Sequence, residues 1–317
     1  MNSRPGTAVV AVGGNALIID NAHKSVPDQF GAAAIAMGYV ADMIASGWTV
    51  VITHGNGPQV GYILRRSELA LHELHPVPMD YAGADTQGAI GYMFQKALRN
   101  EFRRRCIKVE IASVVTQVRV NSDDPAFAQP SKPIGSFMDE KTAEGRALDL
   151  GWTVREDAGR GWRRVVPSPR PVEVIELSAI RTLTQAGFVV VACGGGGIPV
   201  IEKEDEKLRG VEAVIDKDYA SCLLAQQLEA DLFLITTSVE KVALHYGDPG
   251  ERWLDRVTLT EARDYFAAGH FPAGSMGPKI TAIIDYLGAG GERGLITNPV
   301  NIGRALSGET GTTFVPD

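Results

Sequence analysis

Three lysines of this 317-residue chain lie where a positive charge would be expected to meet a bound anion. Lys132 is on a loop bounded by prolines, Lys217 lies between two aspartates at a predicted helix start, and Lys279 lies in the first turn of another predicted helix. A lysine at a helix start opposes the helix dipole by roughly 0.3–1 kcal/mol, and a bound phosphate would reverse the sign of that interaction. Each lysine also has a purely structural interpretation, as an exposed linker charge, a partner of capping acids or a solvated side chain. Together, the three favour a site for phosphate or carboxylate groups.

Glycine-rich loops provide a second indication of the same chemistry. Four consecutive glycines cost backbone entropy to order, which a folded protein accepts where a ligand comes against the main chain. Amide N–H groups at the end of a buried strand form a nest suited to phosphate or carboxylate. Three apolar runs lead into such loops: 8–12 into Gly13-Gly14-Asn15, 49–53 into His54-Gly55-Asn56-Gly57-Pro58, and 188–192 into Cys193-Gly194-Gly195-Gly196-Gly197. Three loops of this kind predict a small-molecule site at one edge of a parallel sheet.

The elements that would position these loops alternate between strand and helix. Near-continuous apolar runs, typical of strands covered on both faces, occur at 8–12, 49–53, 111–115, 188–192 and 232–235. Helical patterns are predicted at 28–46, 59–72, 84–104, from Asp216 or Asp218 to about 229, at 262–268, and at 278–287 with Pro278 in the first position. This alternation predicts an α/β fold in three layers, with an open, mainly parallel sheet between helix layers.

Residues 118–171 interrupt the alternation. They contain six of the 17 prolines, few aliphatic runs, and a predicted hairpin formed by 152–157 and 162–166. We expect a single domain of residues 1–317, in which 118–171 form a small subdomain that projects from the sheet edge and acts as a lid.

The composition argues against several classes of protein. A net charge of −7 without a basic tail makes nucleic acid and anionic membranes poor partners. We expect no membrane span, because no apolar stretch approaches roughly 20 residues, and the first residues lack a signal-peptide pattern. Cys106, Cys193 and Cys222 are widely spaced and fit buried thiols in a reducing cytoplasm rather than a disulfide framework or a zinc site. The sequence therefore predicts a cytoplasmic protein.

Several familiar phosphate-binding and catalytic motifs are absent from the sequence. It has no GxxxxGK[ST] loop, no GxGxxG with a downstream ribose carboxylate, no protein-kinase HRD and DFG signatures, no HExxH and no nucleophile elbow. Anion binding must therefore come from several glycine loops together with separately placed cations.

Blocks of sequence from about residue 8 to 313 resemble the carbamate kinases. They occur in family order at 12–16, 54–61, 86–92, 130–135, 156–163, 165–169, 193–200, 210–218 and 274–279. The blocks EDAGRGWR (156–163) and CGGGGIPV (193–200) separate carbamate kinases from other amino-acid kinases. The resemblance implies the amino-acid-kinase fold and the reversible reaction of ATP with carbamate to give ADP and carbamoyl phosphate, which catabolic members run toward ATP.

The resemblance also implies roles for residues at matching positions. The amides of Gly13, Gly14 and Asn15 would hold the transferring phosphate, and carbamate would lie against Gly55, Asn56, Gly194, Gly195, Gly196 and Gly197. The charge-neutralising lysines would be Lys132, Lys217 and Lys279, with Asp216 orienting the latter two, and the nucleotide would lie near Tyr246, Met276 and Ser238.

Phosphoryl transfer is consistent with what the sequence contains and lacks. It requires in-line positioning and neutralisation of negative charge, and carbamate, already an anion, needs no general base. Mg²⁺ would bridge the ATP phosphates with few protein ligands, for which Asp216 and Asp218 are candidates, without a dedicated metal site. The family resembled here forms homodimers, so we expect two subunits, and a place in arginine or other nitrogen catabolism.

Two other functions remain open on the sequence alone: a kinase of another small carboxylate or amino acid, and a nucleotide-binding sensor that has lost catalysis. The complete set of blocks and the three lysines favour the carbamate kinase. The sequence departs from the commoner family pattern in four places, of which Asn298-Pro299 is expected to be a surface variation without effect. Asp85 could weaken carbamate binding, Pro272-Ala273 could reshape the turn before Ser275, and Ser238 replaces a smaller residue near the nucleotide.

Overall fold

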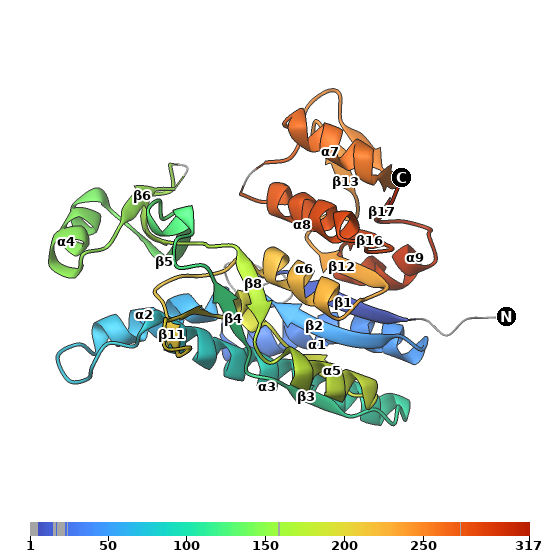
Figure 1. Cartoon of the computed structure of the whole chain (residues 1–317), viewed down its shortest axis with the longest axis horizontal. Helices are drawn as coiled ribbons and strands as arrows, with labels where there is room; N and C mark the ends of the chain where they lie inside the picture. Colours follow the sequence, from blue (N-terminus) through green and yellow to red (C-terminus); the bar gives the residue numbers. More distant parts are fainter. Residues whose placement is uncertain (1–5, 15–16, 18–22, 24, 158, 273) are drawn as a thin grey trace.

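A mainly parallel sheet forms the centre of the computed structural model, which describes residues 6–14, 17, 23, 25–157, 159–272 and 274–317 (Figure 1). Its eight strands lie in the order β15 (Arg256–Thr258), β17 (Thr312–Val315), β16 (Gly294–Thr297), β12 (Leu232–Thr236), β1 (Thr7–Val12), β2 (Thr49–His54), β9 (Val189–Val191) and β3 (Ile111–Ser113). The pairs from β16 to β3 are parallel, whereas β17 runs antiparallel to β16. The predicted fold class is confirmed.

The central strands are buried along nearly their whole length, as their continuous apolar runs predict. Val12, the last residue of β1, pairs with His54, the last residue of β2. Because parallel strands end at the same edge of the sheet, the loops that follow β1 and β2 begin side by side. The glycine loop after β9, the neighbour of β2, begins at this edge as well.

Helices cover both faces of the sheet (Figure 1). One face carries α1 (Val26–Ala45), α3 (Met79–Arg105) and α9 (Ile302–Leu306), and the other carries α5 (Leu177–Gln185), α6 (Lys217–Gln227), α7 (Leu259–Ala267) and α8 (Met276–Gly288). Alternate residues of β1 divide between the two cores: Val9 and Ala11 pack with α6 and α8, whereas Ala8 and Val10 pack with α1 and α3. This period of two is what a strand between two helix layers requires.

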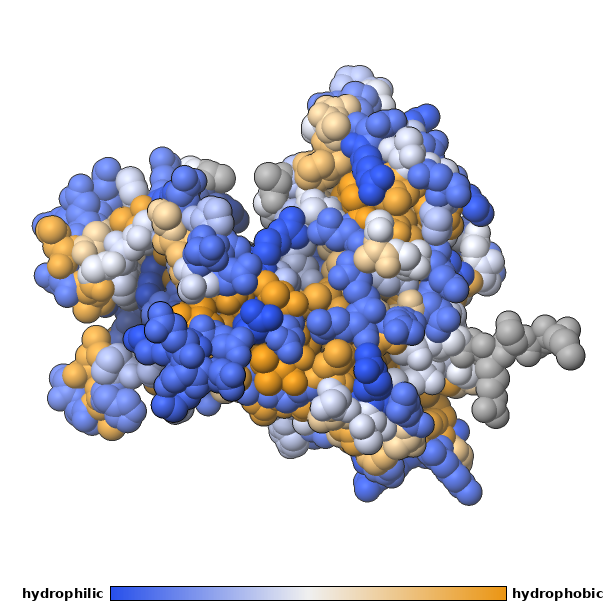
Figure 2. All heavy atoms as spheres, viewed as in Figure 1, coloured by the Kyte–Doolittle hydropathy of each residue, from blue (hydrophilic) through white to orange (hydrophobic). Residues whose placement is uncertain are grey.

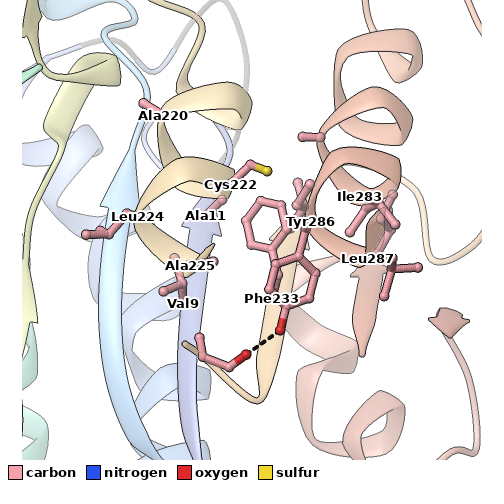
Figure 3. Close-up of a cluster of buried hydrophobic side chains, with 14 of the residues drawn as sticks. Val9, Ala11, Ala220, Cys222, Leu224, Ala225, Phe233, Ile283, Tyr286 and Leu287 are labelled. Atoms are coloured by element: carbon pink, nitrogen blue, oxygen red, sulfur yellow. Dashed lines mark hydrogen bonds between the residues drawn. The ribbon is translucent and has the colours of Figure 1, made fainter. Parts of the chain in front are cut away.

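The α6–α8 side of the core has a polar anchor within its apolar packing (Figure 3). The rings of Phe233 and Tyr286 meet edge to face with centroids 5.5 Å apart. The buried hydroxyl of Tyr286 donates a hydrogen bond to the carbonyl of Ala230, which satisfies the polar end of this large side chain. The packing fixes α6 and α8 side by side, and both helices begin near the ends of the central strands.

Smaller sheets extend the molecule beyond the central one. A four-stranded sheet has the order β11 (Leu208–Gly210), β10 (Ile198–Glu202), β4 (Gln117–Val120) and β8 (Pro171–Val174), and β13 (Val242–Leu244) pairs with β14 (Arg252–Leu254). A three-stranded sheet of β5 (Lys132–Met138), β7 (Trp162–Val166) and β6 (Val154–Glu156) carries α4 (Glu140–Leu150) and projects from the rest, and α2 (Gln59–Leu69) packs beside β5 (Figure 1).

The projecting part is shorter than the 118–171 segment expected from the sequence. β6 and β7 form the predicted antiparallel hairpin. β4 and β8, at the two ends of the segment, belong instead to the four-stranded sheet. The strands that project therefore lie between residues 132 and 166, and the lid role of this part stays a prediction.

Two local expectations were wrong. α8 begins at Met276, so Pro278 is its third residue and not its first, although Lys279 is still in the first turn. Cys106 is exposed because it ends α3 in a left-handed conformation (φ 56°), beyond the last buried turn, whereas Cys193 and Cys222 are buried as expected. Among the helices of the described residues, none has the length and apolar character needed to cross a membrane.

Candidate active site

A cleft of about 260 Å³ lies where the loops after β1, β2 and β9 meet the first residues of α6 and α8. Figure 2 shows the molecule hollowed between the projecting three-stranded sheet and the part that carries α7 and α8. The predicted site residues that line the cleft are Gly14, Gly55, Asn56, Lys132, Gly195, Asp216, Lys217 and Lys279. The structure thus brings together residues that are up to 265 positions apart, from Gly14 to Lys279.

Two of the three lysines share one buried carboxylate. Asp218, on the first turn of α6, accepts from Lys217 through Oδ1, and its Oδ2 is 3.0 Å from the Nζ of Lys279. Burial alone would raise the pKa of Asp218, but Lys217 and Lys279 outweigh it and lower that pKa to about 2. Burial lowers the pKa of Lys217, opposed mainly by Asp218. The expectation that Asp216 orients these lysines is therefore corrected: Asp218 contacts both.

Asp216 has a different partner, the lysine of the projecting sheet. Its Oδ2 lies 2.5 Å from the Nζ of Lys132, and its Oδ1 accepts from the backbone N–H of Asp218 at 2.9 Å as the N-cap of α6. The cap fixes the carboxylate in the lining of the cleft, and β5 places Lys132 beside it. The projecting sheet therefore supplies one cation to a cleft that is otherwise built from the central sheet and its helices.

The four-glycine loop presents one of its residues to the cleft and packs the others behind it. Gly195 lines the cleft with φ at 69°. A Cβ on Gly194 would overlap the His54 ring, and one on Gly196 would overlap the carbonyl of Ile215. The run of glycine is thus required by close approach of other groups as well as by positive φ. Gly197, at φ 84°, approaches Val118 in the same way.

The loop after β1 also has one glycine that lines the cleft and one that packs behind it. Gly14 lines the cleft, but the N–H of Gly13 donates to the Oγ1 of Thr236 at 3.2 Å, so this amide is already engaged. Asn15, expected beside them, lies outside the described residues.

Gly13→Ala is expected to lower the free energy of unfolding by about 1–3 kcal/mol, the usual cost of forcing an extra group into a packed site. The reason is that a Cβ on Gly13 would lie 2.7 Å from the carbonyl oxygen of Thr236. Gly14→Ala is the matched control, since a Cβ there meets nothing within 4 Å. Urea unfolding of the two variants checks this, and equal stability would contradict the packing assigned to Gly13.

A second cavity of about 200 Å³ adjoins the cleft. Its lining includes Tyr246, Ser238 and Met276, the three residues predicted near a nucleotide, and also Lys279, which lines both spaces. Lys279 therefore lies at the junction between the predicted nucleotide region and the predicted acceptor region.

Of the positions that depart from the family pattern, Ser238 and Pro272 line the second cavity together with Lys279, whereas Asp85 lies away from both spaces. Asp85 is exposed on α3 and lines neither of these two spaces. Pro272 lines the second cavity, and Ala273 lies outside the described residues.

The carboxylates leave little room for a metal held by protein ligands. Within the part of the chain that the structure describes, no group of three or more His, Cys, Asp or Glu side chains could hold a metal ion. All four oxygens of Asp216 and Asp218 already accept from lysines or from a backbone N–H. With these carboxylates paired to the lysines, we expect a magnesium ion here to take most of its ligands from nucleotide phosphates and water, as this small cation commonly does.

Two buried side chains behind the cleft were not assigned a role from the sequence. His54 and Gln87 are 1% and 3% exposed and lie against Gly194. Burial lowers the pKa of His54 to about 4, partly opposed by a hydrogen bond to the carbonyl of Gly55, so the ring is neutral near pH 7. A role for them could have been suspected from the sequence, because both lie in blocks (54–61 and 86–92) that resemble the carbamate kinases.

Comparisons with known proteins agree over nearly the whole chain. A model of the amino acid kinase family matches residues 6–298. The chain is 48% identical over 314 residues to the carbamate kinase of Pyrococcus horikoshii, covering 98% of this chain and 100% of that protein. It is 47% identical over 311 residues to the carbamate kinase-like protein YahI of Escherichia coli, covering 97% and 98%. The structure of carbamate kinase from Giardia lamblia bound to AMP-PNP matches with a TM-score of 0.93 and 40% identity, over 99% of each chain.

Proposed function

The chain belongs to the amino acid kinase family, and we infer that it is a carbamate kinase, which transfers a phosphoryl group reversibly between ATP and carbamate. The observation that carries this inference is the cleft in which Lys132, Lys217 and Lys279 meet the glycine loops, next to the cavity lined by Tyr246. Such a site supplies positive charge and backbone donors, and phosphoryl transfer needs little else from a protein.

In the proposed reaction, a carboxylate oxygen of carbamate attacks the γ-phosphorus of ATP. The bond from that phosphorus to the β,γ-bridging oxygen breaks, and its electron pair leaves with ADP. In the reverse direction, a β-phosphate oxygen of ADP attacks the phosphorus of carbamoyl phosphate and releases carbamate. No proton has to move in either direction, which is why the cleft needs no general base.

Positive charge would act on the phosphoryl group from two sides. Lys217 and Lys279 lie in the first turns of α6 and α8, so the helix dipoles add to the charge of their side chains. Lys132 comes from the projecting sheet, opposite these helices. The ion pairs with Asp216 and Asp218 hold the three ammonium groups in place before a substrate arrives, which lowers the reorganisation needed during the reaction.

We propose Mg²⁺ as the accompanying metal, brought to the cleft with the nucleotide. When bound, it would neutralise charge on the phosphates. The chain's own contribution would be to position the phosphates by Lys132 and Lys279 while Asp216 and Asp218 stay paired with the lysines.

We also propose a cytoplasmic homodimer that works toward ATP in arginine or other nitrogen catabolism. The homodimer follows from the family resemblance. Tyr81 and Tyr92, two tyrosines of α3 with 67% and 63% of their surface exposed, are a candidate contact between subunits.

The test is ATP formation from ADP and carbamoyl phosphate. The wild-type protein is expected to turn over, and Lys132→Ala to lower kcat by about 10²–10³-fold, the usual cost of removing one preorganised donor. Lys141→Ala, which removes an exposed lysine of α4 in the same projecting part, is expected to keep wild-type turnover.

Each alternative would give a distinct result in the same assay. A folded, ADP-binding protein without turnover on carbamoyl phosphate would contradict the proposed activity. Phosphorylation of another carboxylate or amino acid with ATP would then indicate a different acceptor, and tight nucleotide binding without turnover on any acceptor would indicate a sensor.

A further inference from the structure

We propose that His54 and Gln87 are positioning residues that lock the two peptide groups on which the acceptor binds. Neither side chain lines the cleft. Each one bonds to a carbonyl whose peptide unit carries, on the cleft side, an N–H without a partner among the described residues. The proposal rests on the proposed function for the identity of the acceptor, a small carboxylate.

Gln87 holds the peptide between Gly194 and Gly195, together with the N–H of Gly197, which donates to the same carbonyl oxygen of Gly194 at 3.0 Å. The Nε2 of Gln87 donates to the carbonyl of Gly194 at 2.9 Å and to that of Thr116 at 3.0 Å, and its Oε1 accepts from the N–H of Thr116 at 2.7 Å. The side chain of α3 thus ties the glycine loop to the segment between β3 and β4. All three bonds of the Gln87 side chain are buried, where a competing water is excluded.

His54 fixes the peptide between Gly55 and Asn56. Its Nδ1 lies 2.9 Å from the carbonyl oxygen of Gly55. A carbonyl can only accept, so Nδ1 carries the proton and the neutral ring is in a single tautomer. The other ring nitrogen, Nε2, is buried without a hydrogen-bond partner among the described residues. The ring of Phe94, nearly perpendicular to the imidazole with centroids 5.6 Å apart, and the nearby backbone of Gly194 hold the ring in this orientation.

The two locked carbonyls determine where the N–H groups of the same peptides point. In a planar trans peptide, C=O and N–H point in opposite directions. Holding the carbonyls of Gly55 and Gly194 on the buried side therefore turns the N–H groups of Asn56 and Gly195 toward the cleft that both residues line. Neither N–H makes a hydrogen bond within the described part of the chain.

The amide side chain of Asn56 joins the two locked units. Its Nδ2 donates to the carbonyl of Gly195 at 2.8 Å, which connects the loop after β2 to the loop after β9. The pair of free N–H groups is therefore held as one unit, suited to a carboxylate oxygen of the acceptor. Donors fixed in advance need no reorganisation when the ligand binds.

The first experiment compares two glutamines of α3. Gln87→Met is expected to lower kcat/KM for carbamoyl phosphate at least tenfold, while the KM for ADP changes less than about twofold. Gln95→Met is the matched control, because Gln95 lies on the same helix and bonds to a carbonyl of β3 at 3.4 Å, away from the cleft. Gln87→Leu, which also removes both donors and introduces no charge, is expected to behave like Gln87→Met and serves if Gln87→Met folds poorly.

A second pair of variants separates the hydrogen bond of His54 from its packing. His54→Asn keeps a donor near the position of Nδ1 and is expected to retain the KM for carbamoyl phosphate within about threefold. His54→Phe keeps the ring and loses the donor, and is expected to raise that KM at least tenfold. The opposite order would show that His54 acts through packing and would overturn its positioning role.

Failure of this inference can be told apart from failure of the proposed function. An active wild type whose Gln87→Met variant keeps its kcat/KM, and whose His54→Phe variant keeps its KM, for carbamoyl phosphate would overturn the inference alone. A wild type inactive on carbamoyl phosphate would refute the proposed function. A crystal structure of Gln87→Met then decides the inference directly: a rotated peptide between Gly194 and Gly195 supports it, and an unchanged peptide overturns it.

Discussion

Lys279→Met is expected to lower kcat for ATP formation by about 10²–10³-fold while the protein stays folded. Lys279 lies at the junction of the two cavities, where the transferring group would pass between nucleotide and acceptor. Methionine keeps the unbranched chain and removes the charge, so packing in the first turn of α8 is retained. The fold should survive because Asp218 keeps Lys217 as its counter-ion.

The control for this variant is Lys207→Met, which removes an exposed lysine that pairs with Asp205 far from the cleft lining. Its kcat should equal that of the wild type. A Lys279→Met protein with kcat within threefold of the wild type would contradict the role given to this lysine. A rise in the KM for ADP with unchanged kcat would instead assign Lys279 to binding alone.

The central sheet could be predicted from the sequence because burial on both faces leaves a local signature. The runs at 49–53 and 232–235 match β2 and β12 to within one residue at each end. The start of α8 was missed by two residues, since Pro278 is acceptable throughout a first turn and does not mark its first position. Cys106 was expected to be buried, but it follows the last residue of α3, where the helix has left the core, and is exposed.

Pairings between distant segments left no local signature. β10 pairs with β4 through Ile198 and Gln117, and nothing in either short strand identifies the other. The projecting part was therefore predicted too long, because the strands at its two ends were not assigned to another sheet.

The candidate site likewise has features that local sequence predicts and features that depend on tertiary packing. The lysines and glycine loops could be found from residue type and local context, and the cleft brings most of them together. Which carboxylate serves which lysine could not be found, because Asp216 and Asp218 are both adjacent to Lys217 in sequence. The choice depends on where α8 places Lys279 and where β5 places Lys132, and both are set by tertiary packing.

Asp218→Asn is expected to lower the free energy of unfolding by about 3–5 kcal/mol at pH 7, the usual cost of breaking a buried ion pair on one side. Asn has nearly the same shape, so no cavity forms. The cost arises because the side chains of Lys217 and Lys279, only 12% and 16% exposed, would lose their shared counter-ion. Asp205→Asn is the control, since its exposed pair with Lys207 should contribute little.

The pH dependence of the free energy of unfolding distinguishes this electrostatic effect from a packing effect, which would not vary with pH in the same way. The pKa of Asp218 is about 2 when folded against 3.8 as the ordinary value, so the unfolded chain takes up the proton first as pH falls. Its contribution, about 2 kcal/mol, is therefore complete above pH 4 and lost toward pH 2, and Asp218→Asn should lack this part of the acid destabilisation.

At alkaline pH, in contrast, the stability of the same variant should depend on pH more strongly than that of the wild type. Burial already lowers the pKa of Lys217, and Asp218 opposes that shift, so removing Asp218 lowers this pKa further. The folded variant then releases a proton that the unfolded chain retains, and linkage requires its stability to rise with pH until Lys217 is neutral in both states. Urea unfolding of the wild type and Asp218→Asn from pH 2 to 10 measures both limbs. Parallel curves for the two proteins would show that Asp218 does not hold the lysines in their charged form.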